Sequence, residues 1–181
     1  VESYGRGSGR SQARSGVDRF AQDLANAGGA GLITPDLTPD YAPEWIAAAD
    51  ERDLDKVFLV APSSTDERIT MTTAACRGFV YATAVMGVTG ARTSTSELAE
   101  PLVTRTKVLS PAGSALPVGV GLGVSNGAQA AELAAYADAA IVGSAFVRTL
   151  QDHADDRTAG LKALSALTED LARGVAGGVR A

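Results

Sequence analysis

The stretch Pro117-Val-Gly-Val-Gly-Leu-Gly-Val-Ser-Asn126 contains the features that decide the fold. Its valines, bounded by turn-forming residues, favour a short buried strand. Gly121 and Gly123 then let the backbone turn sharply and approach a ligand closely, because glycine has no Cβ. Ser125 is suited to cap a helix that we expect over residues 127–135. This order favours an anion-binding site, because the unpaired N–H groups of a helix start point to one place.

A second stretch, Ala139-Ala-Ile-Val-Gly-Ser-Ala-Phe-Val147, repeats the same plan. A buried strand is followed by Gly143-Ser144 and by the start of another helix. Two consecutive strands that end in glycines and a hydroxyl are typical of the phosphate site of (β/α)₈ barrels, which is built after strands 7 and 8.

Composition excludes several classes of function. The chain has 181 residues, 45% of them hydrophobic and 20% charged, with a formal net charge of −5. It has no basic cluster beyond its first residues, so we expect no nucleic-acid partner. It also has no apolar run long enough to cross a bilayer and no signal peptide, so we expect a cytoplasmic protein without a membrane partner. The single cysteine, Cys76, excludes a disulfide framework, and the lone His153 lies among acidic residues. We predict no metal site, a packed Cys76 and a solvated His153.

Strands and helices alternate along the chain. We predict strands over residues 31–34, 56–61, 79–84, 117–121 and 139–142, and helices over residues 17–27, 39–51, 64–76, 101–109, 127–135 and 158–172, with a further helix starting at residue 144. Thr38 and Ser64 are the predicted N-caps of two of these helices. Residues 1–15 have no periodicity and are expected to be disordered or inserted, whereas residues 16–181 form the ordered domain. This alternation predicts an α/β fold with parallel strands, and five strands cannot close an eight-stranded barrel.

Several segments, in the right order, resemble the alpha chain of tryptophan synthase in its bacterial form. The segments are Gly31-Leu-Ile-Thr-Pro-Asp-Leu37, Phe58-Leu-Val-Ala-Pro-Ser-Ser-Thr65, Phe79-Val-Tyr81, Gly87-Val-Thr-Gly90, Val120-Gly-Leu-Gly-Val124 and Ala137-Asp-Ala-Ala-Ile-Val-Gly-Ser144. The resemblance implies a (β/α)₈ TIM barrel, of which this chain would hold strands 4 to 8 with their helices as an incomplete barrel.

By position, the resemblance implies a cradle for the phosphate of indole-3-glycerol phosphate. The implied phosphate-binding residues are Gly90, Gly123, Gly143 and Ser144. Each hydrogen bond to a charged oxygen contributes about 1.5–3 kcal/mol in favourable geometry, and a helix dipole adds somewhat less. The implied indole pocket contains Tyr81, Ile33 and Leu122. Without the resemblance, Tyr81 and Ile33 would be interpreted as plain core.

The resemblance also implies a lid and a partner. Gly87, Thr89 and Gly90 match a loop that closes over bound ligand, although Thr89 could equally be an exposed turn residue. Asp36 matches a residue that faces the partner beta chain, although it could only be fixing the turn over residues 35–38. The family assembles from two alpha and two beta chains. Its pyridoxal phosphate is on the beta chain, so no cofactor is expected in this chain.

The family is a lyase that splits indole-3-glycerol phosphate into indole and glyceraldehyde 3-phosphate in tryptophan biosynthesis. This cleavage needs two positioned acid–base groups, which in the family are a glutamate on strand 1 and an aspartate after strand 2. No residue of this chain matches either group, so we predict no catalytic residue here. Because the chain starts with Val1 rather than methionine, we expect it to be a piece of a longer protein.

Two hypotheses follow for the function. The chain is either part of the lyase subunit, inactive alone, or a degenerate, non-catalytic alpha chain that binds only a phosphate ligand or the beta chain. A phosphate-binding barrel of another pathway is a more distant alternative. In an incomplete barrel, we expect Val118, Val120, Ile141 and Phe58 or its neighbours to face the uncovered interior. We also expect the first and last strands to be unpaired on one side.

Overall fold

The computed structural model describes residues 11–83, 96–112 and 116–178, and the predictions for Gly87, Thr89 and Gly90 lie outside these residues. The helices and strands are α1 (Ser11–Asn26), β1 (Gly31–Ile33), the 3₁₀ helix η1 (Pro39–Tyr41), α2 (Pro43–Asp50), β2 (Asp55–Val57), β3 (Leu59–Val60), α3 (Asp66–Ala75), β4 (Val80–Thr83), α4 (Ser96–Leu109), β5 (Val118–Gly121), α5 (Gly127–Ala134), β6 (Ala139–Ala140), α6 (Ser144–Gln151) and α7 (Arg157–Gly178). Within the described part of the chain, no helix is both long enough and apolar enough to span a membrane.

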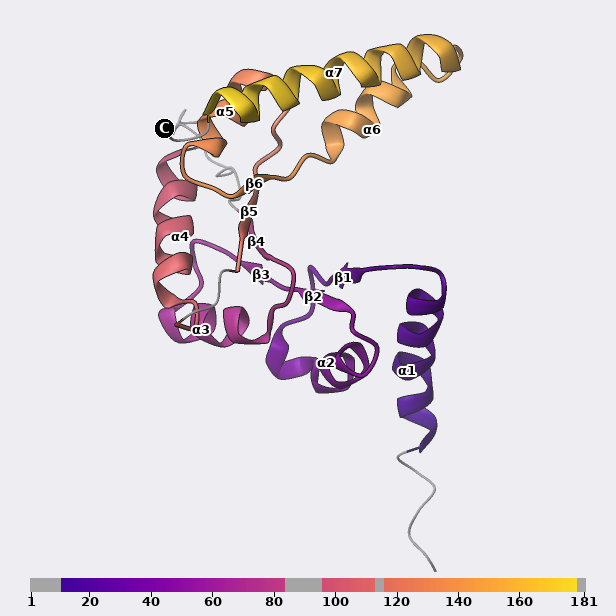
Figure 1. The fold of residues 1–181 in the computed structure, drawn as a ribbon, viewed down its shortest axis with the longest axis vertical. Helices are drawn as coiled ribbons and strands as arrows, with labels where there is room; N and C mark the ends of the chain where they lie inside the picture. The colour runs from indigo at the N-terminus through magenta and orange to yellow at the C-terminus, as the bar shows by residue number, and fades with distance from the viewer. Residues whose placement is uncertain (1–10, 84–95, 113–115, 179–181) are drawn as a thin grey trace, which may run out of the picture.

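All strand pairs are parallel, and the strands lie side by side in chain order. β1 pairs with β2 in one sheet, and β3, β4, β5 and β6 form the second sheet. The elements follow an open arc, with one gap between β1 and α6 (Figure 1). This is the predicted order of a barrel segment.

The strand predicted over residues 56–61 is divided into β2 and β3 by Phe58, which is fully buried. Before Phe58 the strand pairs with β1, and after it the strand pairs with β4. The carbonyl of Phe58 already accepts a hydrogen bond from the N–H of Tyr81 at 3.1 Å. Strands of a barrel are staggered, so one strand pairs with its two neighbours over different parts of its length. The division therefore follows from barrel geometry.

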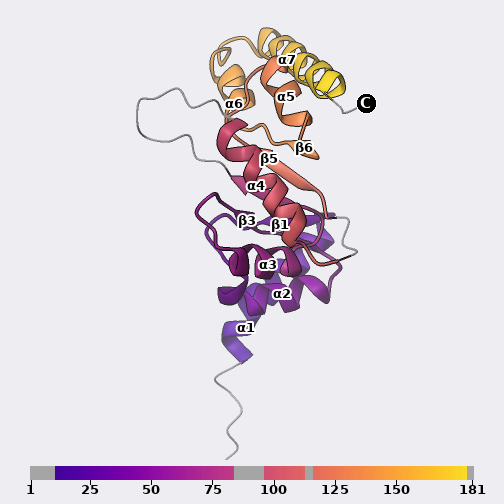
Figure 2. The same ribbon diagram turned by 90° about the vertical axis from the view of Figure 1, so that its left-hand side faces the viewer.

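The helices α3, α4 and α5 cover one face of the second sheet, and α7 packs on α5 (Figure 2). Val118 and Val120 lie in the core between this sheet and the helices, together with Leu102 and Leu133. Phe58 lies in a second core cluster with α1 and α2. The prediction of a position facing the barrel interior was therefore wrong for Val118, Val120 and Phe58 itself. Nearly continuous apolar strands carry no alternation from which the outer face could be identified.

Two helices begin at other residues than predicted. α1 begins at Ser11, ahead of the apolar spacing that starts at Val17. The helix predicted from Pro39 is interrupted, because residues 39–41 form η1 and α2 begins only at Pro43. A proline has no N–H for a helical hydrogen bond and disfavours helical backbone at the residue before it. Pro43 therefore fits the first position of a new helix better than the interior of a longer one.

Two helices are capped one residue later than predicted. Thr65, not Ser64, caps α3, and its hydroxyl accepts a hydrogen bond from the N–H of Arg68. Asn126, not Ser125, caps α5. The Ser64 hydroxyl instead accepts a hydrogen bond from the N–H of Ala61 in the preceding turn, and the Ser125 hydroxyl donates to the side chain of Gln129 in α5. Two helices are longer than predicted: α4 starts earlier, at residue 96, and α7 ends later, at residue 178.

The helices α5 and α7 run parallel and touch through their backbones. A Cβ added at Gly174 would collide with the carbonyl of Gly127, and one added at Gly178 would collide with the carbonyl of Ala131. Glycines four residues apart on α7 thus let its backbone approach α5. This close packing fixes the position of α5, which begins just after Gly123.

We expect Gly174→Ala to lower the free energy of unfolding by about 1–3 kcal/mol, because the added methyl group overpacks the α5–α7 contact. Gly177→Ala on the same helix is the matched control, since nothing lies within 4 Å of its added Cβ. It should leave stability unchanged or raise it by up to about 1 kcal/mol. Urea unfolding followed by circular dichroism measures both variants, and equal losses in the two would contradict the proposed backbone contact.

Candidate phosphate-binding site

The two glycine turns predicted from the sequence follow neighbouring strands at one edge of the sheet. β5 and β6 are paired with Gly119 opposite Ala139. The pairing continues past β6, because the N–H of Ile141 donates to the carbonyl of Val120 at 2.8 Å. Because the strands are parallel, the segments that contain Gly123 and Gly143 leave the sheet at the same edge. In open and closed α/β sheets this carboxyl edge is where ligands bind.

Gly123 provides the backbone conformation of the first turn. Its φ is +71°, a value that residues with a side chain rarely adopt. The residue is exposed, and nothing lies within 4 Å of the place where a Cβ would be. A ligand can therefore approach the backbone of this turn directly.

The start of α6 forms the other half of the candidate site. Gly143 is the residue before the helix, no described side chain caps it, and the exposed Ser144 is the first helical residue. The first backbone hydrogen bond of the helix runs from the N–H of Val147 to the carbonyl of Gly143, at 3.2 Å. The earlier N–H groups and the Ser144 hydroxyl are the kind of donors that bind phosphate at helix starts.

Tyr81 lies beside the end of β5. It is paired with Gly119 of the neighbouring strand, and its hydroxyl lies against Gly121, where any Cβ would collide with it. Tyr81 is half-buried. Glycines in β5 thus make room for the Tyr81 ring next to the turn that contains Gly123. The role of Tyr81 in an indole pocket stays a prediction.

The other predicted residues differ from Tyr81 in their exposure to solvent. Ile33, at the end of β1, is 40% exposed, and Asp36 is exposed in the turn that follows. Leu122 is buried in the main core cluster, among side chains of the sheet and the helices. Leu122 therefore has the surroundings of a core residue, whereas Ile33 is open to solvent.

Sequence reasoning missed two polar residues that shape the Gly123 turn. The side chain of Asn126 accepts a hydrogen bond from the N–H of Gln129 at 3.0 Å. The side chain of Gln129 in turn accepts from the N–H of Ser125 at 2.8 Å. The spacing of Asn126 and Gln129 is that of a capping box, which could have identified them.

The acidic side chains near the carboxyl edge are already engaged or exposed. The Thr38 hydroxyl donates to Asp40 at 2.6 Å and, with Arg68 beside it, holds the pKa of this carboxyl below its usual value. Asp66 binds Arg105 at 2.6 Å. Glu67 is exposed. The hydroxyl and the arginine beside Asp40 favour its charged form, which is the opposite of what a general acid needs.

Cys76 and His153 occupy structural positions. Burial raises the pKa of the Cys76 thiol to about 11, and its sulfur accepts a hydrogen bond from the N–H of Phe58 at 3.4 Å. This confirms that Cys76 is packed. His153 is half-buried rather than fully solvated, with its Nδ1 2.9 Å from the carbonyl of Thr149. Within the described residues, no group of His, Cys, Asp and Glu could hold a metal ion.

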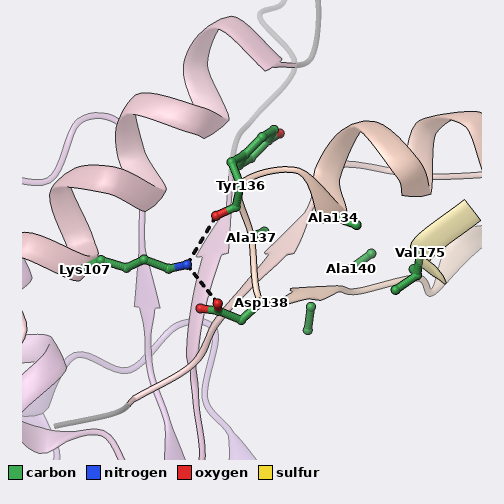
Figure 3. A pocket seen from close by; sticks show the side chains of 8 residues that line it. Lys107, Ala134, Tyr136, Ala137, Asp138, Ala140 and Val175 are labelled. Atoms are coloured by element: carbon green, nitrogen blue, oxygen red, sulfur yellow. Dashed lines mark hydrogen bonds and ion pairs between the residues drawn. The ribbon is translucent and has the colours of Figure 1, made fainter. Parts of the chain in front are cut away.

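A pocket at the opposite, amino-terminal edge of the sheet contains a lysine (Figure 3). The Lys107 ammonium donates to Asp138 at 2.8 Å and to the carbonyl of Tyr136 at 3.3 Å. The second oxygen of Asp138 accepts from the N–H of Val118 at 2.9 Å. These bonds tie α4 to the starts of β5 and β6, so the lysine and the carboxylate serve the fold.

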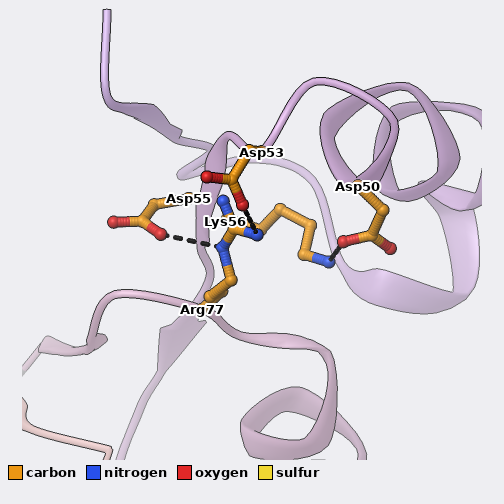
Figure 4. Close-up of polar contacts among 5 residues, drawn as sticks. All are labelled: Asp50, Asp53, Asp55, Lys56 and Arg77. Carbon is orange, nitrogen blue, oxygen red and sulfur yellow. Dashed lines mark hydrogen bonds and ion pairs between the residues drawn. The ribbon is translucent and has the colours of Figure 1, made fainter.

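A second charged cluster lies at the start of β2 (Figure 4). Arg77 binds Asp53 at 2.8 Å and Asp55 at 2.9 Å. The buried Lys56 is paired with Asp50. Each cation is thus matched by a carboxylate, and the cluster joins α2 and β2 to the segment after α3. Such pairs at the amino-terminal edge indicate a structural role.

Parallel strands in chain order and outer helices, with glycine turns after the last two described strands, define the carboxyl-terminal part of a (β/α)₈ barrel. The sequence profile of the tryptophan synthase alpha chain matches residues 12–176. The chain belongs to the tryptophan synthase alpha chain family.

Relatives and solved structures agree with this assignment. The chain is 59% identical over 160 residues to the tryptophan synthase alpha chain of Acidothermus cellulolyticus. These matched residues make up 88% of this chain and 57% of the relative. The chain is also 59% identical over 162 residues to the tryptophan synthase alpha chain of Mycobacterium marinum, and the match covers 90% of this chain and 56% of that relative. The chain thus spans little more than half the length of these curated relatives.

Among solved structures, tryptophan synthase from M. tuberculosis in an open form matches with a TM-score of 0.76 and 52% identity, over 93% of this chain and 58% of that chain. The tryptophan synthase complex from Pyrococcus furiosus matches with a TM-score of 0.74 and 26% identity, over 91% of this chain and 63% of that chain. The fold prediction is therefore confirmed, as a partial TIM barrel.

Proposed function

We propose that this chain acts as the phosphate-binding part of a tryptophan synthase alpha subunit, which cleaves indole-3-glycerol phosphate to indole and glyceraldehyde 3-phosphate. The observation that carries the proposal is the pair of turns at one sheet edge: Gly123, with its positive φ, and Gly143-Ser144 at an uncapped helix start. A phosphate dianion suits these donors because a helix start is positively polarised.

In this proposal, the backbone N–H groups of Gly123, Gly143 and Ser144, with the Ser144 hydroxyl, hold the substrate phosphate. Gly90 is expected to join them. Tyr81, beside the end of β5, and Ile33, at the end of β1, would border the indole ring. The fixed phosphate orients the glycerol chain for carbon–carbon cleavage, and this positioning is the contribution of the chain to catalysis.

The partners and location belong to the same proposal. A cytoplasmic beta chain, which holds pyridoxal phosphate in this family, would dock at the carboxyl edge where Asp36 is exposed. The relevant assembly would contain two alpha and two beta chains. The described residues supply no cofactor chemistry in this scheme, and the acid–base carboxyl groups would come from barrel strands that the 181 residues do not span.

A non-catalytic alpha chain is the second candidate. It is favoured by the surroundings of Asp40, Asp66 and Glu67, because paired or exposed carboxylates do not fit either family role. This candidate binds either a phosphate ligand or the beta chain, so phosphate binding alone does not separate it from the first candidate. Indole release in an assembly with a complete barrel distinguishes them.

Titration with glycerol 3-phosphate, followed by calorimetry, tests the site in the chain assembled with a separate polypeptide that holds strands 1 to 3 of a relative. We expect saturable binding that Gly123→Asp and Ser144→Asp each weaken by about ten- to a hundred-fold, because the added carboxylate repels the phosphate. Ser165→Asp, on the exposed side of α7, adds the same charge elsewhere and is the control. Binding that both site variants leave unchanged would refute the site.

A further inference from the structure

The start of α5 is closed by a carboxylate from another helix. Asp170, in the middle of α7, accepts a hydrogen bond at 2.6 Å from the N–H of Gly127, the first residue of α5. The two residues are 43 positions apart in the sequence. A negative charge thus lies at the positively polarised end of α5, as a bound anion would.

The α5–α7 packing fixes this carboxylate in place. Asp170 lies one helical turn before Gly174, whose backbone touches that of Gly127. A Cβ at Gly127 would in turn meet the backbone and carboxylate of Asp170. Arg173 lies 3.8 Å from the other carboxylate oxygen, but its side chain is 70% exposed, and such pairs contribute little. The carboxylate therefore stays at the helix start without strong neutralisation.

The other donors in this turn are also used internally. The side chain of Asn126 accepts from the N–H of Gln129, and the side chain of Gln129 accepts from the N–H of Ser125. The start of α6 differs, because no described side chain caps Gly143 there. Two helices thus begin after neighbouring strands at the same edge of the sheet, one closed by a carboxylate and one open.

We propose that Asp170 is a positioning residue that directs a phosphate to the start of α6 and away from the start of α5. Its charge repels a dianion from α5, and its hydrogen bond holds the turn that contains Gly123. With α5 open, a phosphate at this edge could bind at either helix start, and the rest of the substrate would have two orientations. The proposal rests on the proposed phosphate site.

Nuclear magnetic resonance of the ¹⁵N-labelled chain tests this role, with the chain assembled with a separate polypeptide that holds strands 1 to 3 of a relative and titrated with inorganic phosphate. In the unaltered chain we expect the Ser144 amide signal to move with phosphate and the Gly127 amide signal to stay. In Asp170→Ala the Gly127 signal should move at phosphate concentrations that leave it unmoved in the unaltered chain, because removing one nearby like charge should strengthen phosphate binding at this helix start by about tenfold. Glu169→Ala, which removes the neighbouring carboxylate on α7, is the control and should leave Gly127 unresponsive.

Asp170→Asn separates charge from hydrogen bonding and covers the case in which Asp170→Ala does not fold. Its amide oxygen can still accept the Gly127 hydrogen bond, so the fold should persist while the repulsion is lost. A Gly127 signal that stays unresponsive in the folded Asn variant would overturn the proposal, as would a response in the unaltered chain. A Ser144 signal that never responds would refute the phosphate site, while the Gly127 signals would still report on Asp170.

Discussion

A polypeptide of these 181 residues is expected to release indole from indole-3-glycerol phosphate about 10⁴-fold or more slower than an intact alpha chain. The reason is that each of two positioned acid–base groups commonly contributes about 10²–10⁴ in rate. Among the described carboxylates near the carboxyl edge, Asp66 is paired with Arg105 and Asp40 with Arg68. The proposed phosphate site would hold the substrate, but the described residues that form it supply no group that moves the required protons.

Adding a separate polypeptide with strands 1 to 3 of a relative should restore indole release. In that mixture, Ser144→Asp should abolish the gain, whereas Ser165→Asp should keep it. Indole release is followed by absorbance in a coupled assay. Activity of the 181 residues alone near that of an intact alpha chain would contradict this prediction and direct attention to Asp36, Asp66 and Glu67. A mixture that forms a complete barrel but releases no indole would favour the non-catalytic alternative.

The sequence predicted the elements well where local chemistry decides them. Short apolar runs bounded by glycine and proline marked every strand, and the Gly143-Ser144 pair marked the start of α6. The positive φ of Gly123 also agrees with its glycine, because other residues rarely adopt it. These features depend on a few adjacent residues, so one sequence is enough to find them.

Features that depend on distant partners could not be predicted in this way. The division between β2 and β3 arises because Phe58 is where the strand changes neighbours. The outward direction of Val118 and Val120 depends on which face the helices cover. The bond between Asp170 and Gly127 joins residues far apart in the chain, and an aspartate in the middle of a helix has no local signal for such a role.

The last prediction concerns the two ends of the arc. Among the described strands, β1 pairs only with β2, and β6 pairs only with β5. Next to β6 is a cavity of about 320 Å³, lined mostly by apolar side chains, including Val142, Phe146 and Leu171. Unpaired strand edges beside apolar surface are templates for association with another chain. The 181-residue chain alone is therefore expected to self-associate or to remain partly molten.

Exposed apolar side chains on α6 and α7 add to this surface. Val147 is 55% exposed and Leu161 is 52% exposed. The double variant Val147→Lys and Leu161→Lys should weaken self-association by about tenfold, since burying each apolar side chain contributes on the order of 1 kcal/mol or more. Val108→Lys is the control, because Val108 is 77% exposed on α4, which lies on the outer side of the arc (Figure 1).

Sedimentation velocity at several concentrations, together with a calorimetric melt, decides between the outcomes. Association through the open ends should increase with concentration and should fall when strands 1 to 3 are added, because the added strands pair with β1 and β6 and cover the same apolar surface. A clean monomer with one sharp melting transition, independent of concentration, would contradict the prediction. In that case β1 and β6 must be protected within the chain itself, since exposed backbone donors and acceptors on an apolar edge do not stay unpaired at high concentration.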